Sequence, residues 1–426
     1  MLIMFLLIAF FILLFIGLPI GVSLGLSSIF GIQFMGAGNL VTAGQRVFEG
    51  MNSFALLAVP LFTFAGLLMG AGGIGKRLID FSYSLVGHIT GGLAHVNVVT
   101  SMIFAGISGS AAADTAYESA LLMPEMVKKK YSKEFTVAVT AISSTIGIII
   151  PPSIPMVIIA GILGISTGKL FMGGIIPGIL CGLSQMIVSY YVAKKEHVPK
   201  EEGPFEIKSV WIAFKESFLA LLMPPVIIFS IMTGIVSPTE VALIAVLYSI
   251  VVGGFIYKEL NWETMKEALI GTVKTTSKVF LIVGSAALFG KLLTTAGFHT
   301  AAQTFLLGLT TSPTLMLIII MIIFLILGTF MEAISTIVLF MPVVYPIALQ
   351  VGIDPIVLSV LIVMMVGIGL VTPPEGMCLF IACDFLKVKV WDAMIALIPF
   401  IIGMLIVIAL CIIFPALITW PASFIG

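Results

Sequence analysis

The chain has 426 residues, of which 60% are hydrophobic and only 9% are charged, and its mean hydropathy is +1.25. A soluble protein of this composition would have too few polar side chains to cover its surface, so the sequence predicts an all-helical polytopic membrane protein. The 20 basic and 20 acidic residues cancel, so net charge gives no indication of a nucleic-acid partner. The four cysteines lie in apolar segments without metal-ligand spacing, which excludes a zinc site and favours buried thiols.

The chain begins with "MLIMFLLIAFFILLFIG", which has neither a basic start nor a small-residue cleavage site. We therefore expect a retained membrane helix over residues 2–17, rather than a signal peptide. A second helix is predicted over 19–35 and a third span over 50–72. The amphipathic stretch over 75–89 is predicted to lie at the membrane interface.

A re-entrant hairpin is predicted next, over about residues 93–127. Only 35 residues separate Gly92 from Lys128, and a Gly/Ser cluster lies near their middle. Two full crossings would need roughly 40 apolar residues and a turn, so two half-depth helices fit better. One full helix followed by a tilted one is the alternative.

A proline-broken helix is predicted over about residues 134–163, followed by a closing span over 169–194. The segment "STIGIIIPPSIPMVIIAG" is apolar enough for a membrane, yet it carries Pro151, Pro152 and Pro155. Proline removes a backbone donor and blocks the carbonyl one turn earlier, so the helix must break. A break within hydrocarbon exposes backbone groups that need partners, which ions or substrate can supply. A simple kink is the structural alternative.

The second half repeats the first at an offset of 222 residues. The matches are Gly106 with Gly328, Pro124 with Pro346, Gly147 with Gly369, and the Pro151–Pro152 pair with Pro373–Pro374. The offset divides the chain into repeat 1 (1–194), a cytoplasmic linker (195–213) and repeat 2 (214–426). Repeat 2 is then predicted to contain two helices over 214–235 and 238–257, a span over 276–297, a hairpin over about 314–348, a broken helix over about 355–385 and a closing span over 392–419.

Five crossings per repeat, an odd number, require the second repeat to be inverted relative to the first. With the N-terminus outside, 17 Lys and Arg residues lie in inner segments, and only Arg46, Lys169 and Lys291 lie outside or near the outer end. This bias satisfies the positive-inside rule. Both termini are therefore predicted to be periplasmic, and the two hairpins to open from opposite sides.

Oxygen-bearing residues gather at the hairpin tips and helix breaks, which favours a small hard cation such as sodium. Discontinuous helices in matching positions of inverted halves are typical of transporter binding sites. Four acids, Asp114, Glu118, Glu332 and Glu375, are also expected at depth, and Asp114 could be a helix cap or an ion ligand. The candidates for substrate contact are Ser110, Asp114, Thr145, Pro151, Thr329, Glu332, Ser335, Pro374 and Glu375.

Other functions fit the sequence less well. A passive channel would need a continuous polar lining, an intramembrane hydrolase would need a paired nucleophile or aspartate, and a scaffold subunit gives no reason for two matched breaks. Proton-coupled transport is the main alternative to sodium coupling, because acids lie at depth. The sequence predicts no catalytic residue and no cofactor apart from a coupling ion.

Four segments, "GISGSAAADTAYESALLMPEM", "IGIIIPPSIP", "GTFMEAISTIVLFMP" and "VGIGLVTPPEG", resemble the large membrane subunit of the tripartite ATP-independent periplasmic (TRAP) transporters. The resemblance covers essentially the whole chain. It implies a sodium-driven importer of organic acids in the bacterial inner membrane, with sialic acid favoured and C4-dicarboxylates next. It also implies an elevator-type fold, a small four-helix membrane subunit as a separate chain, and a periplasmic substrate-binding protein.

The same resemblance implies two sodium sites, carried over by motif. The first would use Ser108, Gly109, Ser110, Gly147, Ile150 and Pro152. The second would use Gly328, Gly369, Thr372 and residues near Met377.

Overall fold

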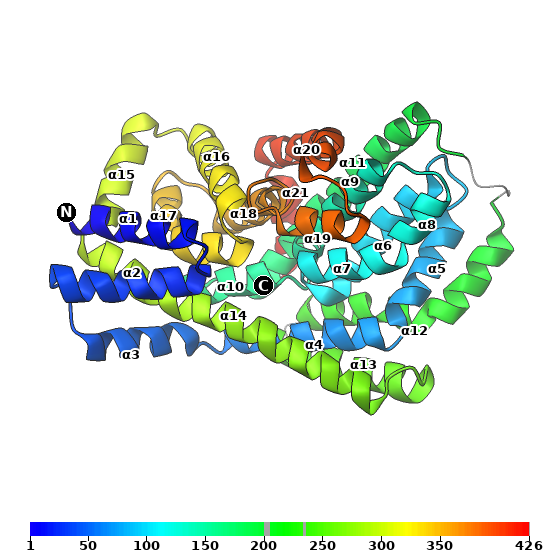
Figure 1. Ribbon diagram of the computed structural model, residues 1–426, viewed down its shortest axis with the longest axis horizontal. Coiled ribbons are helices and arrows are strands. Elements are labelled where there is room, and N and C mark those ends of the chain that lie inside the picture. Colours follow the sequence, from blue (N-terminus) through cyan, green and yellow to red (C-terminus); the bar gives the residue numbers. More distant parts are fainter. Residues whose placement is uncertain (200–204, 233–235, 426) are drawn as a thin grey trace.

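The computed structural model describes residues 1–199, 205–232 and 236–425, and within these ranges the chain forms helices and no strand (Figure 1). Parts of two predicted segments, the cytoplasmic linker and the turn before Pro238, lie outside the described residues. Seven of the described helices are long and apolar enough to cross a membrane, or eight if one bent pair counts as a single span. The predicted all-helical polytopic membrane fold is confirmed.

The first half contains eleven α-helices within the described residues. They are α1 (Leu2–Phe15), α2 (Ile20–Met35), α3 (Leu40–Met51), α4 (Ala58–Ala71), α5 (Ile74–Val86), α6 (Gly92–Ser108), α7 (Ala111–Leu121), α8 (Met123–Lys128), α9 (Lys133–Ser144), α10 (Ile154–Leu163) and α11 (Thr167–Lys195).

The second half follows the same plan from α13 onward. Its helices are α12 (Ile207–Met232), α13 (Pro238–Ile250), α14 (Trp262–Thr295), α15 (Phe298–Leu309), α16 (Pro313–Phe330), α17 (Ala333–Gln350), α18 (Pro355–Gly369), α19 (Met377–Leu386), α20 (Val390–Ile413) and α21 (Ala416–Ala422).

Corresponding helices begin at nearly constant separations along the chain. Among the described residues, α3, α5, α6, α7, α9, α10 and α11 each have a counterpart that begins 221 to 224 residues later: α14, α15, α16, α17, α18, α19 and α20. The packing is exchanged between the halves, because α7 contacts α19 while α17 contacts α10. Figure 1 shows α6 to α8 toward one end of the molecule and α15 to α17 toward the other.

The third span of each half differs from the prediction. The segment expected over 50–72 is a bent pair, in which α3 and the helical segment Ala55–Ala71 meet at 64°. The span expected from residue 276 is part of α14, which begins at Trp262 because Asn261 and Thr264 form a reciprocal capping box. Its 34 residues extend about 51 Å, well beyond a hydrocarbon core of about 30 Å.

The lengths of the hairpin arms do not decide whether each arm crosses the membrane fully or only halfway. Helices α16 and α17 have 18 residues each and belong to the seven candidate spans, whereas α6 has 17 and α7 only 11. The half-depth arms therefore stay a prediction. What the structure does give is the place of each tip, at Gly109–Ser110 and at Met331–Glu332.

Helix α14 packs against helices of both halves. It contacts α2, α3 and α4 of the first half and α17 of the second. Helix α4 also packs on α13, and both α4 and α12 reach α6. The hairpin arms and broken helices thus lie against a group formed by α2, α3, α4, α12, α13 and α14, and we call this group the scaffold.

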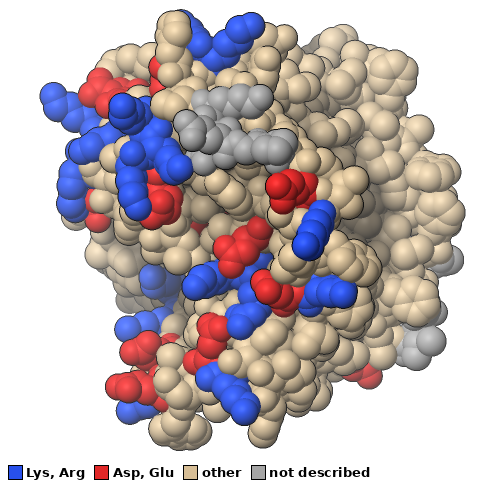
Figure 2. Space-filling view, turned by 90° about the vertical axis from the view of Figure 1, so that its right-hand side faces the viewer, with Lys and Arg blue, Asp and Glu red and all other residues tan. Residues whose placement is uncertain are grey.

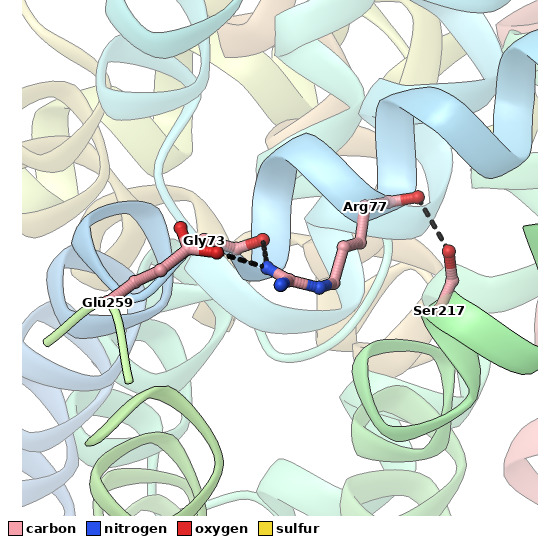
Figure 3. Close-up of polar contacts among 4 residues, drawn as sticks. All are labelled: Gly73, Arg77, Ser217 and Glu259. Carbon is pink, nitrogen blue, oxygen red and sulfur yellow. Dashed lines mark hydrogen bonds and ion pairs between the residues drawn. The ribbon is translucent and has the colours of Figure 1, made fainter. Parts of the chain in front are cut away.

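Arg77 fastens α5 to the scaffold (Figure 3). Its guanidinium donates to the Gly73 carbonyl at 2.8 Å and to Glu259 at 2.7 Å, and it lies 3.7 Å from the centre of the Tyr257 ring. The Ser217 hydroxyl of α12 donates to the Arg77 carbonyl at 2.7 Å. These contacts therefore hold α5 in place where the chain continues into α6.

Charged side chains gather on the face that looks out from the right of Figure 1, as Figure 2 shows. The predicted inner segments hold most of the basic residues of the chain, so this end of the molecule is the one that the positive-inside rule would place in the cytoplasm.

Candidate functional site

The first hairpin turns at Gly109, where the backbone is left-handed with φ of +63°. Helix α6 ends at Ser108, and Ser110 caps α7 by accepting from the Ala113 amide at 3.5 Å. A Cβ at Gly109 would lie 2.8 Å from the Pro152 carbonyl oxygen. The Ile154 amide donates to the Gly109 carbonyl at 3.4 Å. The first tip and the first break are therefore in contact, and glycine permits the close approach.

The first break lies between α9 and α10. A 3₁₀ turn over Thr145–Ile148 follows α9, and the Pro151–Pro152 peptide is cis, as is Pro373–Pro374 in the second half. The Ser153 hydroxyl donates to the Ile148 carbonyl at 2.6 Å and accepts from the Met156 amide at 3.3 Å. One serine thus satisfies a carbonyl on one side of the break and caps the helix on the other.

Two carboxylates are sealed behind the first tip. Asp114 and Glu118 both have no exposed surface. Glu118 accepts hydrogen bonds from Ser101 at 2.6 Å and from Ser144 at 3.2 Å. The oxygens of Asp114 have no hydrogen-bond partner among the described residues, and a Cβ at Gly147 would collide with Asp114 Oδ2. A buried carboxylate without a partner is costly, so a cation or a proton would stabilise this position.

The second tip and the second break also meet. A Cβ at Gly369, at the end of α18, would lie 2.5 Å from the Gly328 carbonyl oxygen of α16. The Glu375 amide donates to the Thr329 carbonyl at 2.9 Å. Thr372 donates to the Ile368 carbonyl at 2.7 Å, and α19 begins at Met377. The arrangement repeats that of the first half, with a hairpin tip joined by backbone contacts to a broken helix.

A single cavity of about 1270 Å³ joins the two tips to the scaffold. Ser108 to Ala113 of the first hairpin line it, as do Glu332 and Ala333 of the second. The breaks contribute residues including Ile154, Pro155, Pro374 and Glu375, and the scaffold contributes Thr63 and Gly66 of α4 with Thr275 and Lys278 of α14. The cavity therefore has one wall from each hairpin and one from the scaffold.

The predicted site residues divide between this cavity and the interior. Ser110, Glu332, Pro374 and Glu375 line the cavity, together with Ser108, Gly109 and Met377. Thr145 and Ser335 are fully buried; Thr145 packs near Gly367. The other candidates, Asp114, Pro151 and Thr329, lie beside the tips and breaks but outside the lining. Ile150 packs its side chain against Gly178 of α11.

Sequence reasoning missed the scaffold wall of the cavity. It assigned Lys278 to an inner segment and placed no basic residue near a tip or break, yet Lys278 lines the cavity with Glu332 and Glu375. Its depth is evident only from the structure, in which α14 begins at Trp262 and Lys278 lies midway along the helix, where a charge is functional by default.

The fold and site are those of a membrane transporter. A solved structure with a similar fold is the YdaH transporter of Alcanivorax borkumensis, with a TM-score of 0.61, 14% sequence identity and coverage of 90% of each chain.

A family model described as "Tripartite ATP-independent periplasmic transporter, DctM component" matches residues 7–417. The sialic acid TRAP transporter large permease of Vibrio cholerae is 36% identical over 97% of both chains. The isethionate TRAP transporter permease of Oleidesulfovibrio alaskensis is 36% identical over 96% of this chain, which spans 64% of that relative's length.

The chain belongs to the DctM family of TRAP transporters and is a large permease, not an enzyme. Membership implies a small membrane subunit, a periplasmic binding protein and residence in the inner membrane.

Proposed function

We propose that this permease imports an organic acid together with sodium ions, and that it receives the acid from a periplasmic binding protein. The observation that carries the proposal is the meeting of two hairpin tips with two helix breaks around one cavity. Sialic acid and isethionate, named for two relatives, are both organic acids. We therefore propose an organic acid as the class of substrate for this chain.

Sodium coupling is supported by the donors at the tips. The carbonyl of Pro152 faces Gly109, the carbonyl of Gly328 faces Gly369, and Ser108 lies beside the first of these contacts. Carbonyl, hydroxyl and carboxylate oxygens are the ligands that hard cations take. Asp114 adds a buried carboxyl oxygen next to Gly147, close to the first predicted site.

The contacts between the hairpin tips and the helix breaks also support an elevator-type motion. The proposed mobile body holds both hairpins and both broken helices, so the tips and breaks would move as a unit against the scaffold. The matching helix separations and the exchanged packing support the two inverted repeats. The charged face in Figure 2 lies at the end opposite the N-terminus of Figure 1, which supports a periplasmic N-terminus. The large cavity is lined by the α1–α2 turn at Gly17 and Leu18, which the predicted topology places on the inner side.

The test is uptake of labelled acid into proteoliposomes that contain the permease, its small subunit and its binding protein. Sialic acid is the first acid to try and a C4-dicarboxylate the second. An inward sodium gradient is compared with a potassium gradient and with a pH gradient. Sodium-dependent uptake that requires the binding protein supports the proposal.

Uptake driven by the pH gradient alone contradicts sodium coupling and directs attention to the buried acids. Equal uptake without any gradient coupling, insensitive to the binding protein, would indicate a passive channel instead.

A further inference from the structure

Lys278 is the basic residue that the substrate cavity presents on its scaffold side. It lies midway along the 34 residues of α14, and its side chain is exposed although the helix is a candidate membrane span. Among the described residues that line the cavity, no other is Lys or Arg. Lys278 forms no ion pair with the described acids. Its charge acts on Glu332 without a direct ion pair, so the ammonium can bind an acid group that arrives with a ligand.

Two acids belong to the same cavity, on the side of the second hairpin. Glu332 lies directly before α17. The backbone amide of Glu375 donates a hydrogen bond to the Thr329 carbonyl, which holds this residue in place. The Glu375 Oε2 atom is buried and has no hydrogen-bond partner among the described residues. An ionised carboxylate accepts hydrogen bonds and donates none, so Glu375 Oε2 can accept a hydrogen bond from a donor on the ligand.

The cavity is thus lined by one ammonium group and two carboxyl groups, and hydroxyl groups of Ser110, Thr63 and Thr275 also line it. A ligand that pairs with these lining groups carries one acid group, which binds Lys278, and several O–H or N–H groups, which donate hydrogen bonds to the glutamates. A second acid group would meet like charges, which is how a site rejects a competitor. A sodium ion at the second predicted site would offset one glutamate, and the other would still repel an anion.

We propose that this cavity selects monoacids rich in hydroxyl groups, that Lys278 binds the single acid group, and that Glu332 and Glu375 exclude dicarboxylates. The assignment rests on the proposed function of organic-acid transport. It makes Lys278 and the two glutamates the residues that determine specificity within that class.

The experiment measures ligand binding to the full-length permease in lipid nanodiscs, in sodium chloride at fixed ionic strength. The probes are gluconate, a monoacid with hydroxyls, succinate, a diacid, and sorbitol, a neutral polyol. The variants are Lys278→Gln and Glu332→Gln/Glu375→Gln. Lys274→Gln is the matched control, because Lys274 is exposed one turn earlier on α14 and does not line the cavity.

The proposal predicts that the wild type binds gluconate and binds succinate and sorbitol at least about tenfold more weakly. Lys278→Gln should weaken gluconate by about tenfold or more and leave sorbitol unchanged, since only the charged contact is lost. The double glutamine variant should strengthen succinate by about tenfold relative to gluconate. Lys274→Gln should match the wild type.

Two results overturn the proposal in different ways. Succinate binding as tight as gluconate, or gluconate binding unaffected by Lys278→Gln, contradicts the charge assignment and leaves organic-acid transport standing. A wild-type protein that binds neither acid, while it remains folded by its melting curve, contradicts the assignment and the proposed function together.

Discussion

Two glycines in equivalent positions, Gly147 and Gly369, face different oxygens. Gly147 abuts the side-chain carboxylate of Asp114, whereas Gly369 abuts the main-chain carbonyl of Gly328. The acids near the first tip are sealed inside the protein, and those near the second tip line the cavity. Under the proposed function, one backbone plan would serve two purposes: the acids of the first half would bind an ion, and those of the second would face a ligand.

The largest expected effect comes from Gly369→Ala. The added Cβ would lie 2.5 Å from a backbone oxygen, which cannot rotate away, and overpacking of this kind costs about 1–3 kcal/mol. Because the tip and the break would be forced apart, sodium-driven uptake should fall at least about tenfold. Gly367→Ala is the control, since its Cβ would meet only side chains at 3.6 and 3.7 Å. Equal activity of the two variants would show that the close contact is unimportant.

Asp114→Asn should show that the sodium dependence of uptake is set at the first tip more than at the second. Replacing the buried carboxyl group near Gly147 by an amide should raise the sodium concentration for half-maximal uptake by about tenfold, because a carboxylate binds a cation more strongly than a neutral amide does. Glu375→Gln is the comparison variant and should shift that value less than about twofold. A larger shift for Glu375→Gln than for Asp114→Asn would reverse the division of roles between the tips.

Arg77→Ala should moderately destabilise α5 and α6, the helices that lead into the first hairpin. Arg77 is partly exposed, with 26% of its side-chain surface accessible, so losing the ion pair and the ring contact should cost about 1–2 kcal/mol. Hydrogen exchange should accelerate in α5 and α6 and stay unchanged in α15 and α16. Lys76→Ala, at the neighbouring position, is the control. Uniform acceleration over both halves would contradict a local anchor.

The smallest effect is expected at the corresponding place in the second half. Gln303 of α15 donates to Gln350 of α17, and this hydrogen bond is exposed. Gln303→Ala should therefore change the melting temperature by no more than an amount equivalent to about 0.5 kcal/mol. A loss as large as that of Arg77→Ala would show that both hairpins are anchored alike.

Local rules explain which parts of the fold were predictable. The helix pairs in question begin and end within a few residues of the limits predicted for the hairpins and broken helices, because glycine and proline act on the backbone at the positions where they occur. The bend before α4 and the early start of α14 escaped prediction. The bend depends on packing against α13 and α14, and the charged residues 263–278 resemble a loop when α14 is not yet known.

The site was predictable in its backbone and less so in its side chains. Gly328 and Gly369 are identified by their pairing with Gly106 and Gly147, and Gly109 by the family resemblance. The structure places Gly109, Gly328 and Gly369 at the contacts between tips and breaks. Lys278 could not be placed, because the face that a helical residue presents depends on which helices surround it. The same holds for Asp114, whose burial comes from α9 and its 3₁₀ turn.

The most direct test of the account is the entry of labelled sodium into proteoliposomes that contain the complete transporter, measured with and without its acid. The account predicts that sodium enters only when the acid and the binding protein are present, and that the acid enters only when sodium is present. Acid uptake that proceeds without sodium entry, under a pH gradient alone, would contradict it.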